Sequence, residues 1–309
     1  MIAFEHITRA YGPARVVDDV TFTVEAGEFC ALMGPSGSGK STLLRMINRL
    51  IEPSGGTIRL DGEEVRHIPP QTLRRRIGYA IQSVGLFPHW TIARNIATVP
   101  RLLRWPRERI ERRIDELLHL LDLDPAAMWE RYPHQLSGGQ QQRVGVARAL
   151  AADPEMLLMD EPFGALDPVT RSSLQAELAR IHRSTGKTIV FVTHDIEEAL
   201  RLGTRIALLR KGKLVQFDTP GRLLAAPADD FVQSFVGSDI GLRLLSLYTA
   251  EDRLRARETA PGEPISKEIN LRDALSLMIE RGVDRLPVAD RGGPIIGVLY
   301  AADLMQGRA

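Results

Sequence analysis

The stretch Gly34-Pro35-Ser36-Gly37-Ser38-Gly39-Lys40-Ser41-Thr42 lies between an apolar run at 29–33 and a helical pattern at 43–50. The apolar run is typical of a buried strand, and apolar residues recur at helical spacing in the later segment. A strand, a glycine-rich loop and a helix in this order predict a phosphate-binding loop, because glycines let successive backbone N–H groups face an anion. Lys40 is then expected to reach the β- and γ-phosphates of a nucleotide, and the Ser41 hydroxyl to bind Mg²⁺.

The segments around this loop predict an α/β fold. Apolar runs at 156–159 and 188–192 are typical of buried parallel strands, and the segment 171–183 between them is expected to be a helix. Antiparallel β-structure is expected near the N-terminus, where strand-like residues and turn signals alternate. The predicted antiparallel strands are 2–7, 20–24 and 57–60, and a largely helical subdomain is expected over about 87–152.

Length and composition are those of an ordinary globular protein. The 309 residues correspond to about two domains, with 44% hydrophobic and 26% charged residues, which excludes a disordered or collagen-like chain. The net charge of +1 gives no electrostatic footprint for nucleic acid, and we expect none as a partner. Cys30 is the single cysteine, so we expect a core residue in a reducing compartment. No apolar run of about 18 residues and no secretory signal are seen, so a cytosolic chain is expected.

A second motif narrows the class of phosphate-binding protein. Leu136-Ser137-Gly138-Gly139-Gln140 begins a predicted helix, with Ser137 as its cap and Gln140 completing a capping box. The motif resembles the signature sequence of ATP-binding cassette (ABC) proteins. The resemblance covers about residues 1–236. It implies that Ser137, Gly139 and Gln140 face the γ-phosphate held by another subunit, so that two cassettes share two ATP sites.

The remaining motifs follow in the order of this family. Residues 157–162 resemble the Walker B strand, which implies that Asp160 holds Mg²⁺ directly or through water and that Glu161 is the general base or orients the water. The alternative is that both carboxylates cap helices. Residues 165–167 resemble the D-loop, with Asp167 near the nucleotide. His194 fits the switch histidine that contacts the γ-phosphate.

Two assignments depend on resemblance and position alone. Gln82 falls where ABC proteins carry the glutamine that senses Mg²⁺ and the attacking water. Tyr11 fits the aromatic residue that stacks on adenine, and a buried core tyrosine is the alternative. The expected catalytic residues are Glu161, His194, Lys40 and Gln82, and the expected metal ligands are Ser41, Gln82 and Asp160.

The segment 78–92, which includes Leu86, Phe87 and Trp90, looks like importers for quaternary amines such as glycine betaine, proline, choline and carnitine. This resemblance implies a peripheral subunit on the cytoplasmic face of the inner membrane. Its partners would be integral permease subunits, an extracytoplasmic solute-binding protein and a second ATPase subunit, identical or related. An importer of another nutrient and a non-transport ABC ATPase are the alternatives. A third possibility is a regulatory protein in which the C-terminal unit dominates.

The character of the sequence changes near 237–240, so we predict one domain at 1–236 and a second at 239–309. A helix is expected at 270–282, strands at 286–288 and 295–299, and a last helix at 301–305. The pattern resembles a single cystathionine β-synthase (CBS) repeat, although Tyr300 replaces the usual Ser or Thr. Asp303 could hold an adenosine ribose, but an element that pairs across subunits is the favoured interpretation.

Overall fold

The computed structural model describes residues 1–81, 85–164, 166–290 and 293–305, which form two compact units. The first unit is Met1–Phe217 and the second is Asp218–Ala309. The first unit therefore ends earlier than the boundary that the sequence predicts at 237–240. Helix α10 (Pro220–Ala225) packs against α11 (Asp230–Val236) and α12 (Ile240–Ser246), which places these helices together in the second unit.

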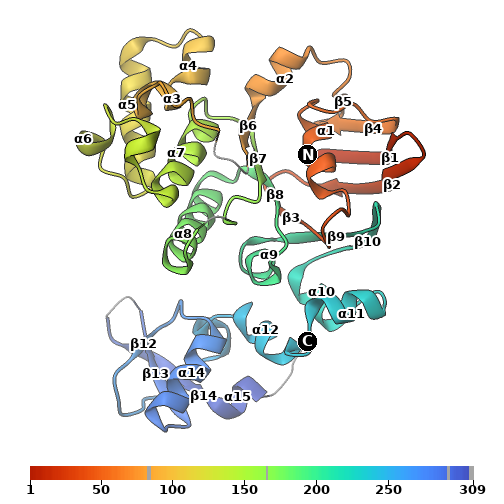
Figure 1. The fold of residues 1–309 in the computed structure, drawn as a ribbon. Coiled ribbons are helices and arrows are strands. Elements are labelled where there is room, and N and C mark those ends of the chain that lie inside the picture. Colours follow the sequence, from red (N-terminus) through yellow and green to blue (C-terminus); the bar gives the residue numbers. More distant parts are fainter. Residues whose placement is uncertain (82–84, 165, 291–292, 306–309) are drawn as a thin grey trace. The chain divides into compact units, whose positions relative to one another are not determined.

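A six-stranded sheet forms the centre of the first unit (Figure 1). Strand β3 (Phe29–Met33) pairs in parallel with β8 (Thr188–Val192) and β9 (Arg205–Arg210). Strand β7 (Met156–Asp160) pairs in parallel with β8 and β6 (Ile77–Ala80). Every residue of β3, β7 and β8 is buried, which confirms the predicted parallel sheet of apolar strands. In spatial order the strands are β10 (Lys213–Asp218), β9 (Arg205–Arg210), β3 (Phe29–Met33), β8 (Thr188–Val192), β7 (Met156–Asp160) and β6 (Ile77–Ala80).

The parallel strands all run in one direction, so their carboxyl ends meet at one edge of the sheet. Four of the segments that leave this edge are those that the sequence assigns to nucleotide chemistry. They are the loop after Met33, the acidic pair at the end of β7, Thr193 and His194 after β8, and the segment after Ala80.

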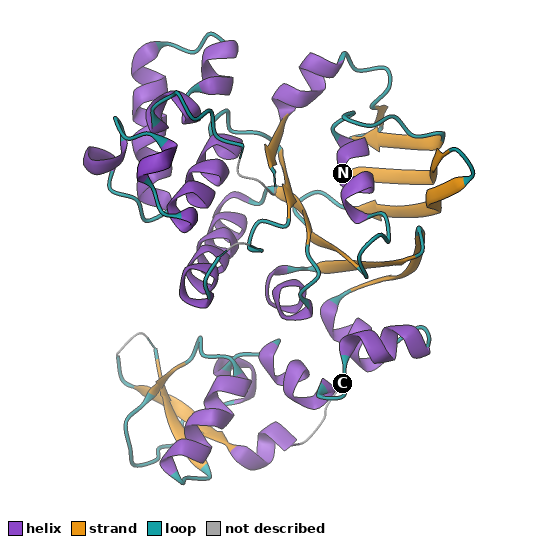
Figure 2. Cartoon of the chain, viewed as in Figure 1, coloured by secondary structure: helices purple, strands orange, loops and turns teal. Residues whose placement is uncertain are grey.

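An antiparallel sheet accompanies the central sheet (Figure 2). Its core is shared with helix α1 (Lys40–Ile47), and the rings of Phe4 and Phe22 stack at 4.5 Å within it. Cys30 belongs to the same buried cluster, as predicted, and burial raises the pKa of its thiol. The strands, in spatial order, are β2 (Ala14–Val24), β1 (Ile2–Tyr11), β4 (Gly55–Leu60) and β5 (Glu63–Glu64).

The predicted helical subdomain is confirmed. Helix α7 (Gly138–Leu150) contacts α3 (Ile92–Ile96), α5 (Arg107–Leu120) and β6, so it joins the helical layer to the edge strand of the central sheet. The helices of this layer are α3 (Ile92–Ile96), α4 (Thr98–Leu102), α5 (Arg107–Leu120), α6 (Pro125–Met128), the 3-10 helix η1 (Pro133–Gln135) and α7 (Gly138–Leu150). The remaining helices of this unit are α2 (Pro70–Arg76), α8 (Pro168–Thr185) and α9 (Ile196–Leu202).

The second unit is a small α/β structure with its own apolar core. The strands of its sheet, in spatial order, are β11 (Arg255–Ala256), β14 (Ile295–Tyr300), β13 (Arg285–Ala289) and β12 (Ile265–Ser266). Helix α14 (Leu271–Arg281) packs against β13, α12 and α15 (Ala301–Met305). The predicted C-terminal elements are confirmed to within a residue or two at each end. They are α14 (Leu271–Arg281), β13 (Arg285–Ala289), β14 (Ile295–Tyr300) and α15 (Ala301–Met305). Three further elements precede them in the chain: α13 (Ala250–Arg253), β11 (Arg255–Ala256) and β12 (Ile265–Ser266).

Candidate nucleotide-binding site

The loop from Gly34 to Gly39 requires glycine for steric as well as conformational reasons. Gly39 is the N-cap of α1 with φ +99°, and a Cβ there would lie 2.6 Å from the carbonyl oxygen of Val16. Gly34 has φ +138°, and a Cβ there would lie 2.0 Å from the carbonyl oxygen of Leu209. Only glycine fits positions with a left-handed backbone and a neighbouring chain this close.

Lys40 lies inside this loop. Its side chain is 7% exposed, and Nζ donates hydrogen bonds to the carbonyl oxygens of Gly34 (2.7 Å) and Pro35 (2.9 Å). Burial lowers the pKa of the ammonium group, and the charges of Glu161 and Asp160 oppose this effect. The lysine is therefore a buried cation aimed at the space where the loop would receive an anion.

The carboxylate of Asp160 sits at the end of β7 and is 2% exposed. Its Oδ1 accepts a hydrogen bond from the Ser41 hydroxyl at 2.8 Å. Its Oδ2 lies 3.3 Å from the Arg45 guanidinium. Sequence reasoning missed Arg45, although its place one helical turn after Ser41 on α1 was a signal that both residues share a face.

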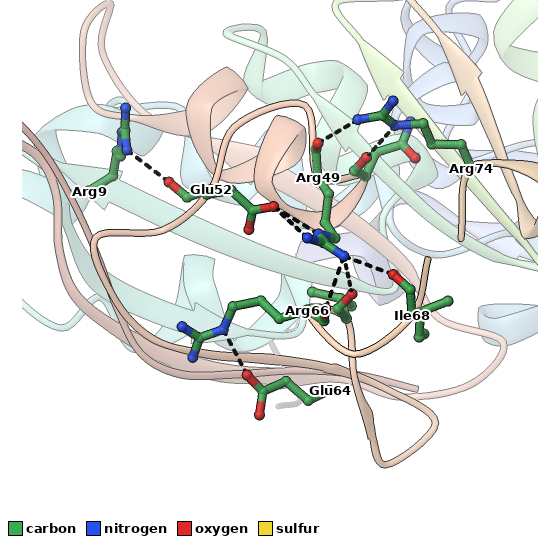
Figure 3. A network of polar contacts seen from close by, with 9 residues as sticks. Arg9, Arg49, Glu52, Glu64, Arg66, Ile68 and Arg74 are labelled. Carbon is green, nitrogen blue, oxygen red and sulfur yellow. Dashed lines mark hydrogen bonds and ion pairs between the residues drawn. The ribbon is translucent and has the colours of Figure 1, made fainter. Parts of the chain in front are cut away.

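Arginines fix the other end of α1. Figure 3 shows Arg49, which follows the helix, donating to the backbone carbonyls of Arg66 (3.1 Å) and Ile68 (2.8 Å). Arg74 of α2 donates to the carbonyl oxygens of Asn48 (3.2 Å) and Arg49 (2.6 Å), as Figure 3 also shows for Arg49. The carbonyls of Asn48 and Arg49 follow the last turn of α1, where carbonyl groups have no partner within the helix. The helix that begins at Lys40 is thus held at its far end as well.

Glu161 follows Asp160 and has a left-handed backbone with φ +48°, an uncommon conformation for a residue with a side chain. Its N–H donates to the carbonyl oxygen of Val192 at 3.1 Å. Its Oε1 lies 3.8 Å from Nδ1 of His194, which is largely exposed. Helices α8 and α9 take their side-chain caps from Asp167 and Asp195, so the alternative of Asp160 and Glu161 as caps of these helices does not hold.

These groups surround one cavity of about 360 Å³. Its size lies within the range of small-molecule sites. The lining residues come from the phosphate-binding loop, the end of β7 and the end of β8: Ser36, Gly37, Gly39, Lys40, Ser41, Thr42, Glu161 and His194, together with Val16 of β2. The structure thus brings the phosphate-binding loop, Glu161 and His194 to a single place, and Asp160 adjoins this lining through its hydrogen bond with Ser41.

The turn that carries His194 is held by a buried pair. The hydroxyl of Thr193 donates to Oε2 of Glu198, and both side chains are buried. The Thr193 hydroxyl oxygen also accepts from the N–H of Asp195 at 3.0 Å. Burial raises the pKa of Glu198, and the hydrogen bond from Thr193 opposes this. The sequence analysis did not identify this pair, although Glu198 lies five residues after Thr193.

The predicted capping box at the start of α7 is confirmed. The Ser137 hydroxyl oxygen accepts from the N–H of Gln140 at 3.3 Å, and Oε1 of Gln140 accepts from the N–H of Ser137 at 3.0 Å. Gly138 and Gly139 form the first turn between them. Asp167 caps α8 by accepting from the N–H groups of residues 169 and 170. The hydrogen bond from the Thr170 side chain is the main cause that lowers the pKa of Asp167, and the bond from the Thr170 N–H adds to it.

Several other predicted residues do not line this cavity, and Tyr11 is one of them. Tyr11 is 48% exposed, so the alternative of a buried core tyrosine is wrong. The Arg9 guanidinium lies 4.3 Å from the centre of the Tyr11 ring. Gln82 and Ala165 lie outside the described residues.

Asp303 of the second unit is already engaged within that unit. Both of its carboxylate oxygens accept from Arg255, at 2.8 and 2.9 Å. The same guanidinium lies 4.6 Å from the centre of the Tyr300 ring, and the Tyr300 hydroxyl donates to Glu258. The hydrogen bond from Arg255 lowers the pKa of Asp303.

The donor set fits Mg²⁺. Ser41 and Asp160 present hard oxygen atoms, and Mg²⁺ is commonly bound by one or two such groups together with substrate phosphates. Among the described residues, no group of three or more His, Cys, Asp or Glu could hold a metal ion without a substrate. No helix in the described parts of the chain is long and apolar enough to cross a membrane.

The fold and the site define a P-loop nucleotide-binding domain of the ABC type. The ABC transporter family profile matches residues 17–164, and a CBS domain profile matches residues 263–308. A solved dimeric ATP-binding cassette in a post-hydrolysis state, bound to ADP and Pi, is 34% identical with a TM-score of 0.65. This similarity covers 71% of our chain and 99% of that one.

Two curated relatives extend over the whole chain. The glycine betaine uptake system ATP-binding protein YehX of Escherichia coli is 57% identical, over 99% of our chain and 99% of its own length. The glycine betaine/carnitine/choline transport ATP-binding protein OpuCA of Bacillus subtilis is 47% identical, over 100% of our chain and 80% of its own. The chain belongs to the family of ABC transporter ATP-binding proteins.

Proposed function

We propose that this protein is the ATP-hydrolysing subunit that powers uptake of glycine betaine or a related quaternary amine. The observation that carries the proposal is the single cavity where Lys40, Ser41, Glu161 and His194 meet, in a chain 57% identical to a glycine betaine uptake ATPase. An importer for another nutrient would have the same ATP site, so this site does not identify the transported molecule. The transported molecule therefore needs a direct test.

The residues of the site would have different roles in ATP binding and hydrolysis. Backbone N–H groups of the glycine-rich loop and the Lys40 ammonium would hold the phosphate chain, and Tyr11 would stack on the adenine. Glu161 would accept a proton from the attacking water, and His194, 3.8 Å from its carboxylate, would contact the γ-phosphate. Gln82 would complete this arrangement. Bound Mg²⁺ would neutralise charge on the phosphates, held by Ser41 and Asp160.

The second half of each ATP site would come from another ATPase subunit. The capped start of α7, with Ser137, Gly139 and Gln140, presents N–H groups and a positive helix end suited to a γ-phosphate. We infer that two such chains face each other, with Asp167 near the shared boundary. ATP binding would close the pair and hydrolysis would reopen it, which would drive permease subunits in the membrane. The chain would lie on the cytoplasmic face, with a binding protein on the other side.

The second unit would serve this assembly as a pairing element. Because Arg255 occupies both oxygens of Asp303, an adenosine ribose would have to displace an ion pair at this position. Pairing with the same unit of another subunit requires no such displacement.

The catalytic assignment is tested with Glu161→Gln. We expect the variant to bind ATP with unchanged affinity and to lose at least 100-fold in steady-state hydrolysis, since removal of a general base costs about 10²–10⁴-fold. Glu155→Gln, a surface carboxylate paired with Arg76, is the matched control and should keep full activity. Normal hydrolysis by Glu161→Gln would sink the assignment.

The cargo is tested with the chain purified from its native membrane in mild detergent, together with whatever accompanies it. Reconstitution of that complex should give ATP-dependent uptake of radiolabelled glycine betaine, carnitine or choline. Uptake of a different nutrient would overturn the assignment of the cargo and support the assignment as an importer ATPase. Purification with ribosomes or nucleic acid and without a membrane protein would overturn the importer function.

A further inference from the structure

The catalytic and binding roles proposed above do not involve Arg45, although this residue contacts Asp160. It lies on α1 four residues after Ser41, and its guanidinium is about half exposed. Its partner is the deeply buried Asp160, at 3.3 Å. A buried carboxylate is costly unless both of its oxygens have partners, and here Arg45 takes one oxygen while Ser41 takes the other.

Metal binding would affect the Ser41–Asp160 and Arg45–Asp160 contacts differently. The oxygen that accepts from Ser41 belongs to the predicted metal site, whereas the other oxygen contacts Arg45, one helical turn further along α1. The planar guanidinium can therefore keep its contact with Oδ2 while Oδ1 and Ser41 turn to the metal. A hydrogen-bond partner outside the ligand set that fixes the orientation of a metal-binding carboxylate typically contributes 10–100-fold in metal affinity.

The charge of Arg45 also acts on a second element. Burial and the charge of Asp160 raise the pKa of the Tyr79 phenol on β6, and the Arg45 guanidinium opposes this rise. Strand β6 pairs with β7 through Tyr79 and Leu158, so Tyr79 lies on the strand next to the one that ends in Asp160. The segment that leaves β6 at Ala80 is the one that contains Gln82.

We propose that Arg45 is a positioning residue of the metal site, which orients the Asp160 carboxylate for Mg²⁺. This inference rests on the proposed ATPase function. It does not make Arg45 a ligand, because a guanidinium has no electron pair to give a cation.

The test is the affinity for a divalent cation, measured separately from hydrolysis. Mn²⁺ replaces Mg²⁺ as an electron paramagnetic resonance probe, and it is titrated into the full chain saturated with a non-hydrolysable ATP analogue. For Arg45→Met we expect the Mn²⁺ dissociation constant to rise about 10–100-fold. The affinity for the analogue without any divalent cation should change less than twofold. A general loss of structure would lower both affinities together.

Three further variants make the result specific. Arg45→Lys keeps the charge but lacks the planar fork, so its Mn²⁺ affinity should lie between those of wild type and Arg45→Met. Tyr79→Phe should show a smaller loss than Arg45→Met, because the contact with Asp160 remains. Arg107→Met removes an exposed arginine that pairs with Glu111 and should match wild type.

The outcomes distinguish a failure of the positioning role of Arg45 from a failure of the proposed ATPase function. Wild-type Mn²⁺ affinity in Arg45→Met would overturn the positioning role and leave the ATPase assignment intact. Full rescue by Arg45→Lys would reduce the role to charge alone and would also overturn it. Failure of the wild-type chain to bind the analogue would instead contradict the proposed function.

Discussion

Gly39→Ala is the change in the phosphate-binding loop whose cost the structure predicts most directly. Gly39 has φ +99°, and an added Cβ would lie 2.6 Å from the Val16 carbonyl oxygen and 3.1 Å from Cγ2 of Val17. The backbone conformation alone costs a residue with a side chain about 1–3 kcal/mol. Forcing an extra carbon into a packed site costs about another 1–3 kcal/mol. We therefore expect the free energy of unfolding to fall by about 2–6 kcal/mol.

The matched control is Gly186→Ala at the end of α8. Gly186 also has a left-handed backbone, with φ +62°, but an added Cβ there would have no atom within 4 Å. Only the conformational cost remains, about 1–2 kcal/mol for a single left-handed residue. Urea unfolding of both variants, followed by circular dichroism without nucleotide, measures the difference between them.

Nucleotide binding provides the second readout. Movement of Gly39 away from Val16 displaces the N–H groups at the start of α1, so we expect ATP affinity to fall at least tenfold, or about 1.4 kcal/mol. Gly186→Ala should bind ATP like wild type. Equal unfolding costs for the two variants, or normal ATP binding by Gly39→Ala, would refute the steric argument.

Three further predictions concern side chains. Ser137→Ala removes the cap of α7 and should lower stability by about 1 kcal/mol in urea unfolding, and an unchanged midpoint would contradict the role of the capping box. Glu198 has a folded-state pKa raised above 4.5 by burial, so the folded state binds its proton more tightly than the unfolded chain. Stability from this group should therefore fall as pH rises from 4.5 through the folded pKa, and Glu198→Gln should become more stable relative to wild type over that window. A pH-independent difference between the two proteins in urea unfolding would oppose this. Arg255→Met should raise the pKa of Asp303 toward its ordinary range, which carboxyl NMR titration measures, and an unchanged titration would show that Arg255 is not its cause.

Several parts of the fold could be predicted because they depend on neighbours along the chain. The apolar run at 29–33 forms the strand with the same bounds, and the run at 188–192 does so as well. The capping box at Ser137 joins residues three positions apart, so its spacing alone indicates it. The phosphate-binding loop is likewise a continuous stretch whose glycines have the left-handed backbone that the motif requires.

Other parts depend on segments far apart in the sequence. Arg45 meets Asp160 across 115 positions, because α1 and β7 come together only once β8 lies between β3 and β7. Arg255 and Asp303 are 48 positions apart and meet because β11 pairs with β14. The boundary between the units is a further case, since helices α10 and α11 carry no local signal of which unit they join.

The sequence by itself determined the class of chemistry, because a loop that binds phosphate and a helix that starts with its own cap are local structures. The tertiary structure decided which side chains share the site and how each is held. That second level depends on the order of parallel strands, which fixes which carboxyl ends are neighbours and is not written in any local pattern. Asp160 therefore appears in the sequence as an acidic residue after a strand, and only the folded chain gives it Ser41 and Arg45 as partners.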